Sequence, residues 1–234
     1  MSTDDEKAPA DAALMFDLMQ TQRRRTQSRL VRRYAWLLLV WAAAWGVGFT
    51  ALWFGRDIGG VPVLPAIVAW IVFAACMVIA IVWSIVTGIR SGNSGIRGRS
   101  VLQGTLYGWS WTISMVGAWF LTVGLQRAGL AADVATLLYP ALYIFLVGVL
   151  YLAGGALWRS IAQYVLGVVM IAVVIVATFI GAPWHFLVYA TLGPVAMIVG
   201  SFLLWRGILP AESPEPRRAS AADAAEPREH GEPS

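Results

Sequence analysis

Residues 62–88 read PVLPAIVAWIVFAACMVIAIVWSIVTG, and no charged residue interrupts these 27 positions. A helix of about 20 apolar residues is long enough to cross the hydrocarbon core of a bilayer. The run Ile71-Val72-Phe73-Ala74-Ala75 does not alternate apolar and polar residues, as a strand of a membrane β-barrel would. The stretch therefore predicts a transmembrane helix.

The same pattern recurs on both sides of this stretch. Apolar residues make up 59% of the 234 residues and charged residues only 13%, a balance too apolar for a water-soluble globule. Of the 30 charged residues, 22 lie in residues 1–33 and 206–234. The sequence predicts an all-α, polytopic membrane helix bundle with six transmembrane helices. The expected spans are 34–54, 62–88, 101–126, 135–157, 161–181 and 185–205.

The distribution of Lys and Arg predicts the orientation of these spans. With six spans and a cytoplasmic residue 1, fifteen of the seventeen cations lie on the cytoplasmic side, and only Arg56 and Arg127 face outward. Cytoplasmic loops carry the excess of positive charge in membrane proteins. Both termini are therefore predicted to be cytoplasmic, and the cations are attributed to topology and not to nucleic-acid binding.

The chain divides into three parts by composition. Residues 1–33 are predicted to form a cytoplasmic segment with a short amphipathic basic helix, because Leu14, Met15, Leu18 and Met19 fall at helical spacing before a cluster of arginines. This helix would lie on the inner leaflet or dock on a cytosolic partner; alternatively, it is a solvated extension whose arginines only set topology. Residues 34–208 form the six-helix transmembrane domain. Residues 209–234 lack aromatic residues and are predicted to be a disordered cytoplasmic tail.

The spans offer little chemistry. They contain no Asp, Glu, Lys or Arg, and His185 is their one histidine; beside Trp184, it is expected to be interfacial and in contact with water. The chain has a single cysteine, Cys76, and no His-Glu-x-x-His motif. The sequence therefore predicts no catalytic, cofactor or metal site, and we expect the protein not to be an enzyme.

Hydroxyl groups make up much of the remaining polar content of the spans. Tyr139, Tyr143 and Tyr151 are separated by multiples of four, so they share one side of a helix. Such groups would line a polar cavity for a small amphipathic molecule, or they would only form hydrogen bonds between helices. The candidate cavity residues are Tyr107, Ser110, Ser114, Tyr139, Tyr143 and Tyr151.

Two further features concern helix packing. Gly193 and Pro194 fall midway along the last span, where loss of a backbone hydrogen bond favours a kink, so they are predicted to form a hinge. The pairs Ala42/Gly46, Ala44/Gly48 and Gly104/Gly108 have the small-x-x-x-small spacing that lets helices approach closely. The close approach would occur within the chain or between protomers.

The segments Pro140–Tyr143 and Gly148–Arg159, with the basic stretch that leads into Trp36–Trp45, resemble a group of uncharacterised actinobacterial small multi-pass membrane proteins that are loosely labelled transporters. The resemblance covers most of the membrane part and supplies no site residues. It implies a bacterial cell (inner) membrane protein.

Two functions remain open from the sequence. The first is a small-molecule transporter or permease-type component, in contact with the lipid bilayer and driven by a cytosolic ATPase, since the chain has no nucleotide-binding motif of its own. The second is an accessory or regulatory membrane protein that binds another membrane protein and moves no solute. A homo-oligomer is compatible with both.

Overall fold

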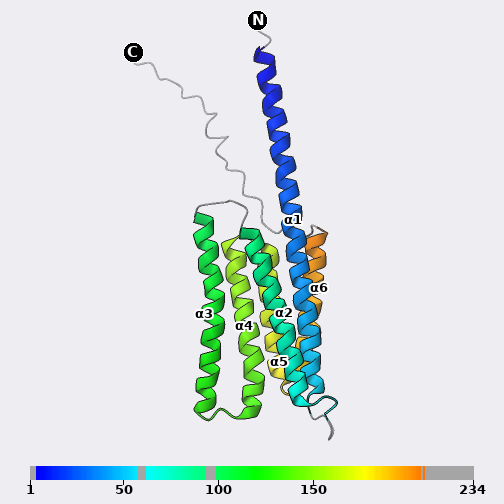
Figure 1. Cartoon of the computed structure of the whole chain (residues 1–234), viewed down its shortest axis with the longest axis vertical. Coiled ribbons are helices and arrows are strands. Elements are labelled where there is room, and N and C mark those ends of the chain that lie inside the picture. Colours follow the sequence, from blue (N-terminus) through cyan, green and yellow to red (C-terminus); the bar gives the residue numbers. More distant parts are fainter. Residues whose placement is uncertain (1–3, 57–61, 93–98, 207, 209–234) are drawn as a thin grey trace, which may run out of the picture.

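The computed structural model describes residues 4–56, 62–92, 99–206 and 208. Over these residues the chain is all-helical, with no strand, as the sequence predicts (Figure 1). The helices are α1 (Asp4–Phe54), α2 (Ala66–Gly92), α3 (Arg99–Arg127), α4 (Ala132–Leu157), α5 (Ile161–Ile180) and α6 (His185–Trp205). The disordered tail predicted for residues 209–234 lies outside the described residues.

Five helices are long and apolar enough to cross a membrane: the second part of α1, from Val31 to Phe54, and helices α2, α4, α5 and α6. The predicted membrane helix bundle is confirmed. Helix α3 does not reach the same hydropathy, because Trp, Tyr, Ser, Thr and Gly are frequent in it. It is nevertheless free of charge between Arg99 and Arg127 and runs alongside α4 over the same depth of the bundle (Figure 1). That α3 also crosses the membrane, which would bring the number of spans to six, stays a prediction.

The first helix differs from the sequence-based expectation. Instead of a short helix within residues 1–33 followed by a separate span, α1 is one continuous helix of 51 residues. Residues 4–30, which we call the arm, extend beyond the span by about 40 Å at 1.5 Å per residue. The arm leaves the bundle at the end where α6 finishes, which we call the arm end (Figure 1).

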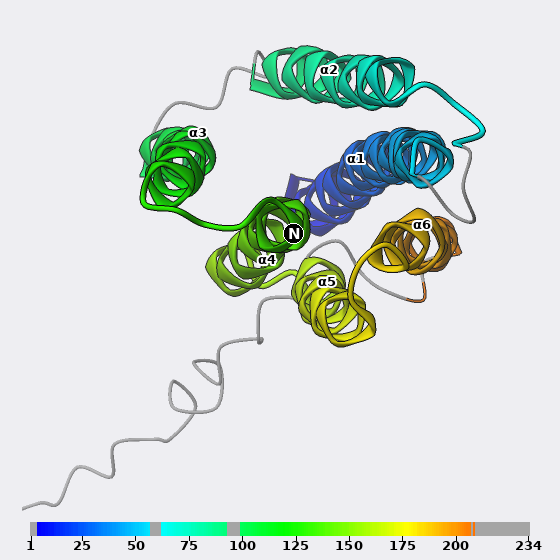
Figure 2. The ribbon, with the colours of Figure 1, turned by 90° about the horizontal axis from the view of Figure 1, so that it is seen from below.

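The helices are not packed equally. Helix α1 packs on both α2 and α6, α6 also packs on α5, and α5 packs on α4. Helices α2 and α3 lie at the periphery, with α2 held by α1 and α3 held mainly by α4 (Figure 2). Two side chains join α1 to its neighbours: Ser201 Oγ donates a hydrogen bond to the carbonyl of Ala35 at 3.0 Å, and Trp41 Nε1 donates to Ser84 Oγ at 3.0 Å.

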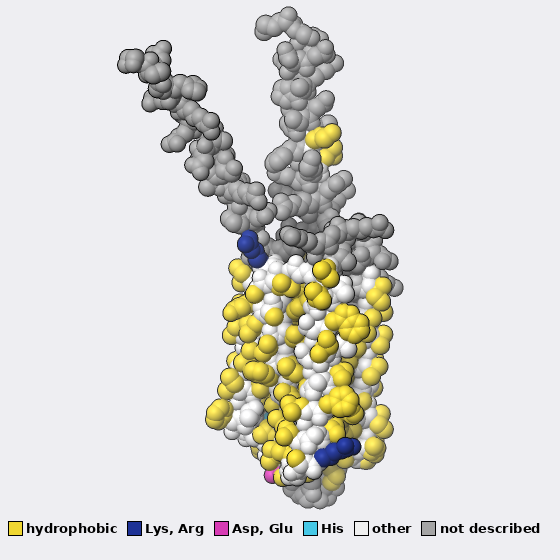
Figure 3. Space-filling view, turned by 90° about the vertical axis from the view of Figure 1, so that its left-hand side faces the viewer, with side chains coloured by type: hydrophobic (Ala, Val, Ile, Leu, Met, Phe, Trp, Pro, Cys, Tyr) yellow, Lys and Arg dark blue, Asp and Glu magenta, His cyan; other side chains and the backbone are white. Residues whose placement is uncertain are grey.

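The surface of the bundle is apolar between its two ends. On the face drawn in Figure 3, the charged side chains among the described residues lie only near the ends of the bundle. Large apolar side chains such as Ile67, Ile79 and Ile113 are exposed on the peripheral helices. In water such a surface would be unfavourable, whereas in a bilayer it faces acyl chains of the same polarity.

The two short connections end their helices as the sequence predicts. After α4, Arg159 adopts a left-handed backbone conformation with φ of 53°, and the Ser160 side chain caps α5 by accepting a hydrogen bond from the Gln163 amide. After α5, Gly181 has φ of 78°, which glycine adopts without strain. Helices α4, α5 and α6 therefore follow one another as tight antiparallel hairpins.

Candidate functional site

The predicted cavity residues do not gather at one place. Tyr107, Ser110 and Ser114 lie on α3, and Tyr139, Tyr143 and Tyr151 lie on α4. Tyr139 and Tyr151 are twelve residues apart, or about 18 Å along the helix. Tyr107 and Tyr151 flank the Trp111 ring, with centroid distances of 6.2 and 5.6 Å. The structure thus brings together Tyr107 and Tyr151 and leaves Tyr139 near the opposite end of the bundle.

Tyr107 joins three helices at the arm end. Its hydroxyl donates to the carbonyl of Leu150 on α4 at 2.6 Å and accepts from Gln163 Nε2 on α5 at 3.3 Å. The Trp158 ring packs edge to face on the Tyr107 ring at a centroid distance of 4.6 Å. The sequence left two roles open for these polar groups, lining a cavity or forming hydrogen bonds between helices. The hydroxyl of Tyr107 has the second role, because both of its hydrogen bonds join α3 to another helix.

The other candidates have contacts of similar kinds. Tyr139 donates to Gln126 Oε1 at 3.2 Å, which joins α4 to α3, and Ser110 donates to the Leu106 carbonyl of its own helix at 2.9 Å. Ser114 and Tyr143 are half-buried. A cavity lined by these six residues stays a prediction; the interhelical contacts described here are made by Tyr107, Tyr139 and Tyr151.

Replacing Tyr107 by phenylalanine should destabilise the bundle by about 0.6–1.7 kcal/mol, the range of interhelical hydrogen bonds in membranes. The matched control is Ser110→Ala, which removes a hydroxyl bonded within its own helix and should change stability by less than about 0.5 kcal/mol. Thermal denaturation of the purified protein in mild detergent measures both. Equal stability of Tyr107→Phe and the unmodified protein would contradict the packing role.

The predicted hinge residues lie in the contact between α6 and α1. Gly193 and Pro194 are both buried, and a Cβ atom on Gly193 would lie 2.6 Å from Trp45 Cε3. A Cβ atom on Gly46 would lie 3.7 Å from Pro194 Cγ, so the predicted close approach at Gly46 occurs within the chain. Bending at Gly193-Pro194 stays a prediction; the described contacts give the pair a packing role.

His185 differs from its expectation. It is buried, with 0% of its surface exposed, so the water contact expected for it is wrong, although it lies at the end of the bundle, where α6 begins. The sharp turn at Gly181 folds the first turn of α6 into the bundle, and the Arg56 guanidinium at the end of α1 stacks over the neighbouring Phe186 ring at 5.1 Å. This geometry removes His185 from the surface.

His185 and Tyr189 form a buried polar pair at the end of the bundle opposite the arm. Their rings meet edge to face at a centroid distance of 6.0 Å, and Tyr189 is also 0% exposed. The backbone of Thr136 and Gly181 adjoins the imidazole. However, neither ring nitrogen of His185 nor the hydroxyl of Tyr189 has a hydrogen bond of ordinary geometry within the described residues.

Sequence reasoning missed Tyr189, although a signal was present. Residues 185 and 189 are four apart and therefore stand on one face of α6. Polar groups in the interior of a membrane domain are costly and mark candidate functional sites. The pair could donate and accept hydrogen bonds to a small polar ligand, and no carboxylate within the described part of the chain adjoins the imidazole to complete a catalytic dyad.

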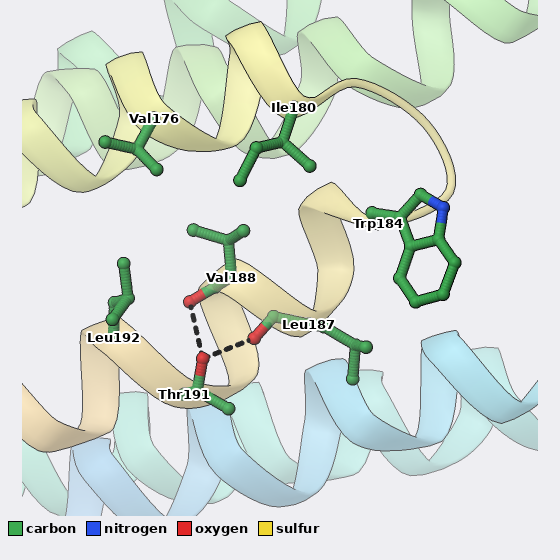
Figure 4. A pocket seen from close by; sticks show the side chains of 7 residues that line it. All are labelled: Val176, Ile180, Trp184, Leu187, Val188, Thr191 and Leu192. Atoms are coloured by element: carbon green, nitrogen blue, oxygen red, sulfur yellow. Dashed lines mark hydrogen bonds between the residues drawn. The ribbon is translucent and has the colours of Figure 1, made fainter.

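An apolar groove lies between α5 and α6 (Figure 4). It holds about 360 Å³ and is lined by two residues from α5, Val176 and Ile180, and by five around the start of α6: Trp184, Leu187, Val188, Thr191 and Leu192. The hydroxyl of Thr191 is used within its own helix, where it donates to the Leu187 carbonyl at 2.7 Å. The groove therefore presents hydrocarbon and suits an acyl chain, and none of the predicted cavity residues lines it.

The arm is the remaining candidate. Met15 and Leu18 are 63% and 55% exposed although both are apolar. They lie on the part of α1 that extends beyond the span, away from the acyl chains that cover the apolar surface of the bundle (Figure 1). They offer apolar surface that a binding partner would bury.

Comparison with known proteins assigns none of these sites. No protein-family model, curated protein or solved structure matches the chain.

Proposed function

We propose that the protein is an accessory or regulatory membrane protein, not an enzyme, that holds a soluble protein at the membrane through its arm. The observation that carries the proposal is the continuity of α1, which extends 27 residues beyond its span as a helix with exposed apolar side chains. The polar side chains that would favour a solute pathway, Tyr107 and Tyr139, form interhelical hydrogen bonds instead.

In this proposal the arm is cytoplasmic. The six arginines at positions 23, 24, 25, 29, 32 and 33 lie around the start of the first span, where a dense positive cluster retains the adjoining segment on the inner side. The end of α6 lies at the same end of the bundle, so both chain ends are proposed to be cytoplasmic in a bacterial inner membrane (Figure 1).

Deleting residues 4–22 should abolish capture of the partner while the arginine cluster still directs insertion. Full-length and truncated protein are expressed at equal levels, solubilised in mild detergent, purified and compared by quantitative mass spectrometry. We expect one soluble protein to be enriched at least about tenfold with the full chain, because the exposed apolar side chains would be buried in the complex. Equal recovery with both forms would contradict the proposal.

A small-molecule transporter or permease component is the second candidate, and the buried pair of His185 and Tyr189 favours it. Buried ionisable groups in a membrane bundle commonly belong to substrate or ion pathways. The same purification distinguishes the two candidates. Capture of a nucleotide-hydrolysing protein would favour transport driven by that partner, whereas capture of a regulator or kinase would favour the accessory role.

A further inference from the structure

One face of the arm helix has apolar residues in its first part and basic residues in its last part. Positions 14, 18, 22, 25 and 29 of the arm, with position 32 just beyond it, follow one another at intervals of three or four residues, so a continuous helix aligns them along one side. The first two positions are leucines, and the last three are arginines. We call this side the arm face; position 15, a methionine, adjoins it.

The structure separates the apolar part of the arm face from the membrane. Leu18 is thirteen residues before Val31, where the span begins, which corresponds to about 20 Å along a continuous helix. An amphipathic helix that binds a leaflet lies in the plane of the membrane, whereas the arm continues along the axis of the membrane-spanning part of α1 (Figure 1). Lipid therefore does not cover the apolar side chains of Met15 and Leu18.

On grounds of charge, a second copy of the chain is also disfavoured as the partner that binds the arm face. Two copies in one membrane have parallel arms, and joining their arm faces would place the arginines of one copy against those of the other. Like charges at such short distances repel, and an arm-to-arm pair would gain no compensating acid from positions 25, 29 and 32. Charge complementarity thus favours an acidic partner.

We propose that the arm face is bound by a soluble protein with an apolar groove and an acidic rim. Leu14, Met15 and Leu18 are the residues that the groove would take, and Arg25 and Arg29 are those that the rim, nearer to the membrane, would pair with. Recognition of an amphipathic helix through anchors three and four residues apart is a recurring mode of protein association. This inference rests on the proposed function and names the chemistry of its partner.

Site-specific photo-crosslinking in intact cells tests the occupant. A benzophenone amino acid replaces Leu18 on the arm face, or Phe16, which the helical register places about 160° away, in the full-length chain. We expect an adduct with a soluble protein from position 18 at about tenfold or higher yield than from position 16. An arm-to-arm adduct, an adduct with lipid alone, or equal protein adducts from both positions would overturn the inference.

Paired substitutions test the apolar part and the basic part of the arm face separately. Leu18→Ser and Arg29→Glu should each reduce the recovery of the soluble protein by about tenfold or more, and the effect of Arg29→Glu should shrink as salt is raised, since exposed charge pairs are screened. Phe16→Ser and Arg23→Glu, which make the same chemical changes off the arm face, should change it less than about twofold. Equal losses within each pair would overturn the inference.

If deletion of residues 4–22 abolishes recovery while the pairs do not differ, only this inference fails; if the deletion has no effect, the proposed function fails as well.

Discussion

Replacing Gly167 by alanine is expected to force α4 and α5 apart and to destabilise the bundle by about 1–3 kcal/mol, the usual cost of overpacking. A Cβ atom at this position would lie 2.8 Å from the carbonyl oxygen of Gly148 and 2.8 Å from the backbone nitrogen of Leu152. These are backbone atoms of α4, so no side-chain rotation relieves the contact. The whole helix has to move.

The matched control is Gly124→Ala on α3, where nothing lies within 4 Å of the added atom. Alanine favours a helix over glycine by up to about 1 kcal/mol, so this variant should be as stable as the unmodified protein or more stable. Thermal denaturation in detergent, followed by the loss of monodisperse protein in gel filtration, compares the two. Equal melting temperatures for the two variants would refute the close approach of α4 and α5.

Replacing Gly193 by alanine should have a comparable effect on the contact between α1 and α6. The added atom would lie 2.6 Å from Trp45 Cε3 and 2.9 Å from Trp45 Cζ3. Trp45 is itself buried and packs edge to face on Phe49 at a centroid distance of 5.6 Å, so its indole cannot turn away. We expect a loss of about 1–3 kcal/mol, again measured by thermal denaturation.

Gly108→Ala is the control for Gly193→Ala, since nothing lies within 4 Å of its added atom. The contact at Trp45 also changes how a hinge should be tested. Substitution of both Gly193 and Pro194 would alter packing and bending together, whereas Pro194→Ala alone adds no atom against Trp45. A Gly193→Ala variant as stable as Gly108→Ala would show that α1 and α6 do not pack through this glycine.

The helix boundaries were predictable because local chemistry sets them. Span 185–205 coincides with α6, span 161–181 differs from α5 by one residue, and span 101–126 differs from α3 by a few residues at most. Charged residues and Gly181 end the apolar runs, and their effects act within a turn of the chain. Pro65 lies inside the expected span 62–88, and α2 begins directly after it, at Ala66. For residues 1–33 the polar composition favoured a separate short helix, whereas the alternative, a helical extension, agrees better with the continuous α1, since nothing at the junction breaks a helix.

The positions of side chains within the bundle were not predictable in the same way. His185 follows an interfacial tryptophan in the sequence, yet it is buried because the turn at Gly181 and the end of α1 enclose it. Of the three small-residue pairs, Gly46 faces Pro194 of α6 and Gly48 faces Phe73 of α2, whereas Gly104 and Gly108 meet nothing within 4 Å. The spacing of the three pairs is identical, so sequence alone could not separate them.

The amino-acid sequence by itself determined the helical class, the ends of most helices and the separation of charge from the apolar spans, since these follow from residues close together in the chain. Only the tertiary structure decided which side of each helix faces a neighbour, which glycines let backbones approach and in which direction the arm extends. The physical reason is that lipid is as apolar as the core of the bundle. Hydrophobicity therefore cannot mark the buried side of a membrane helix, and shape complementarity with residues far away in the sequence selects it.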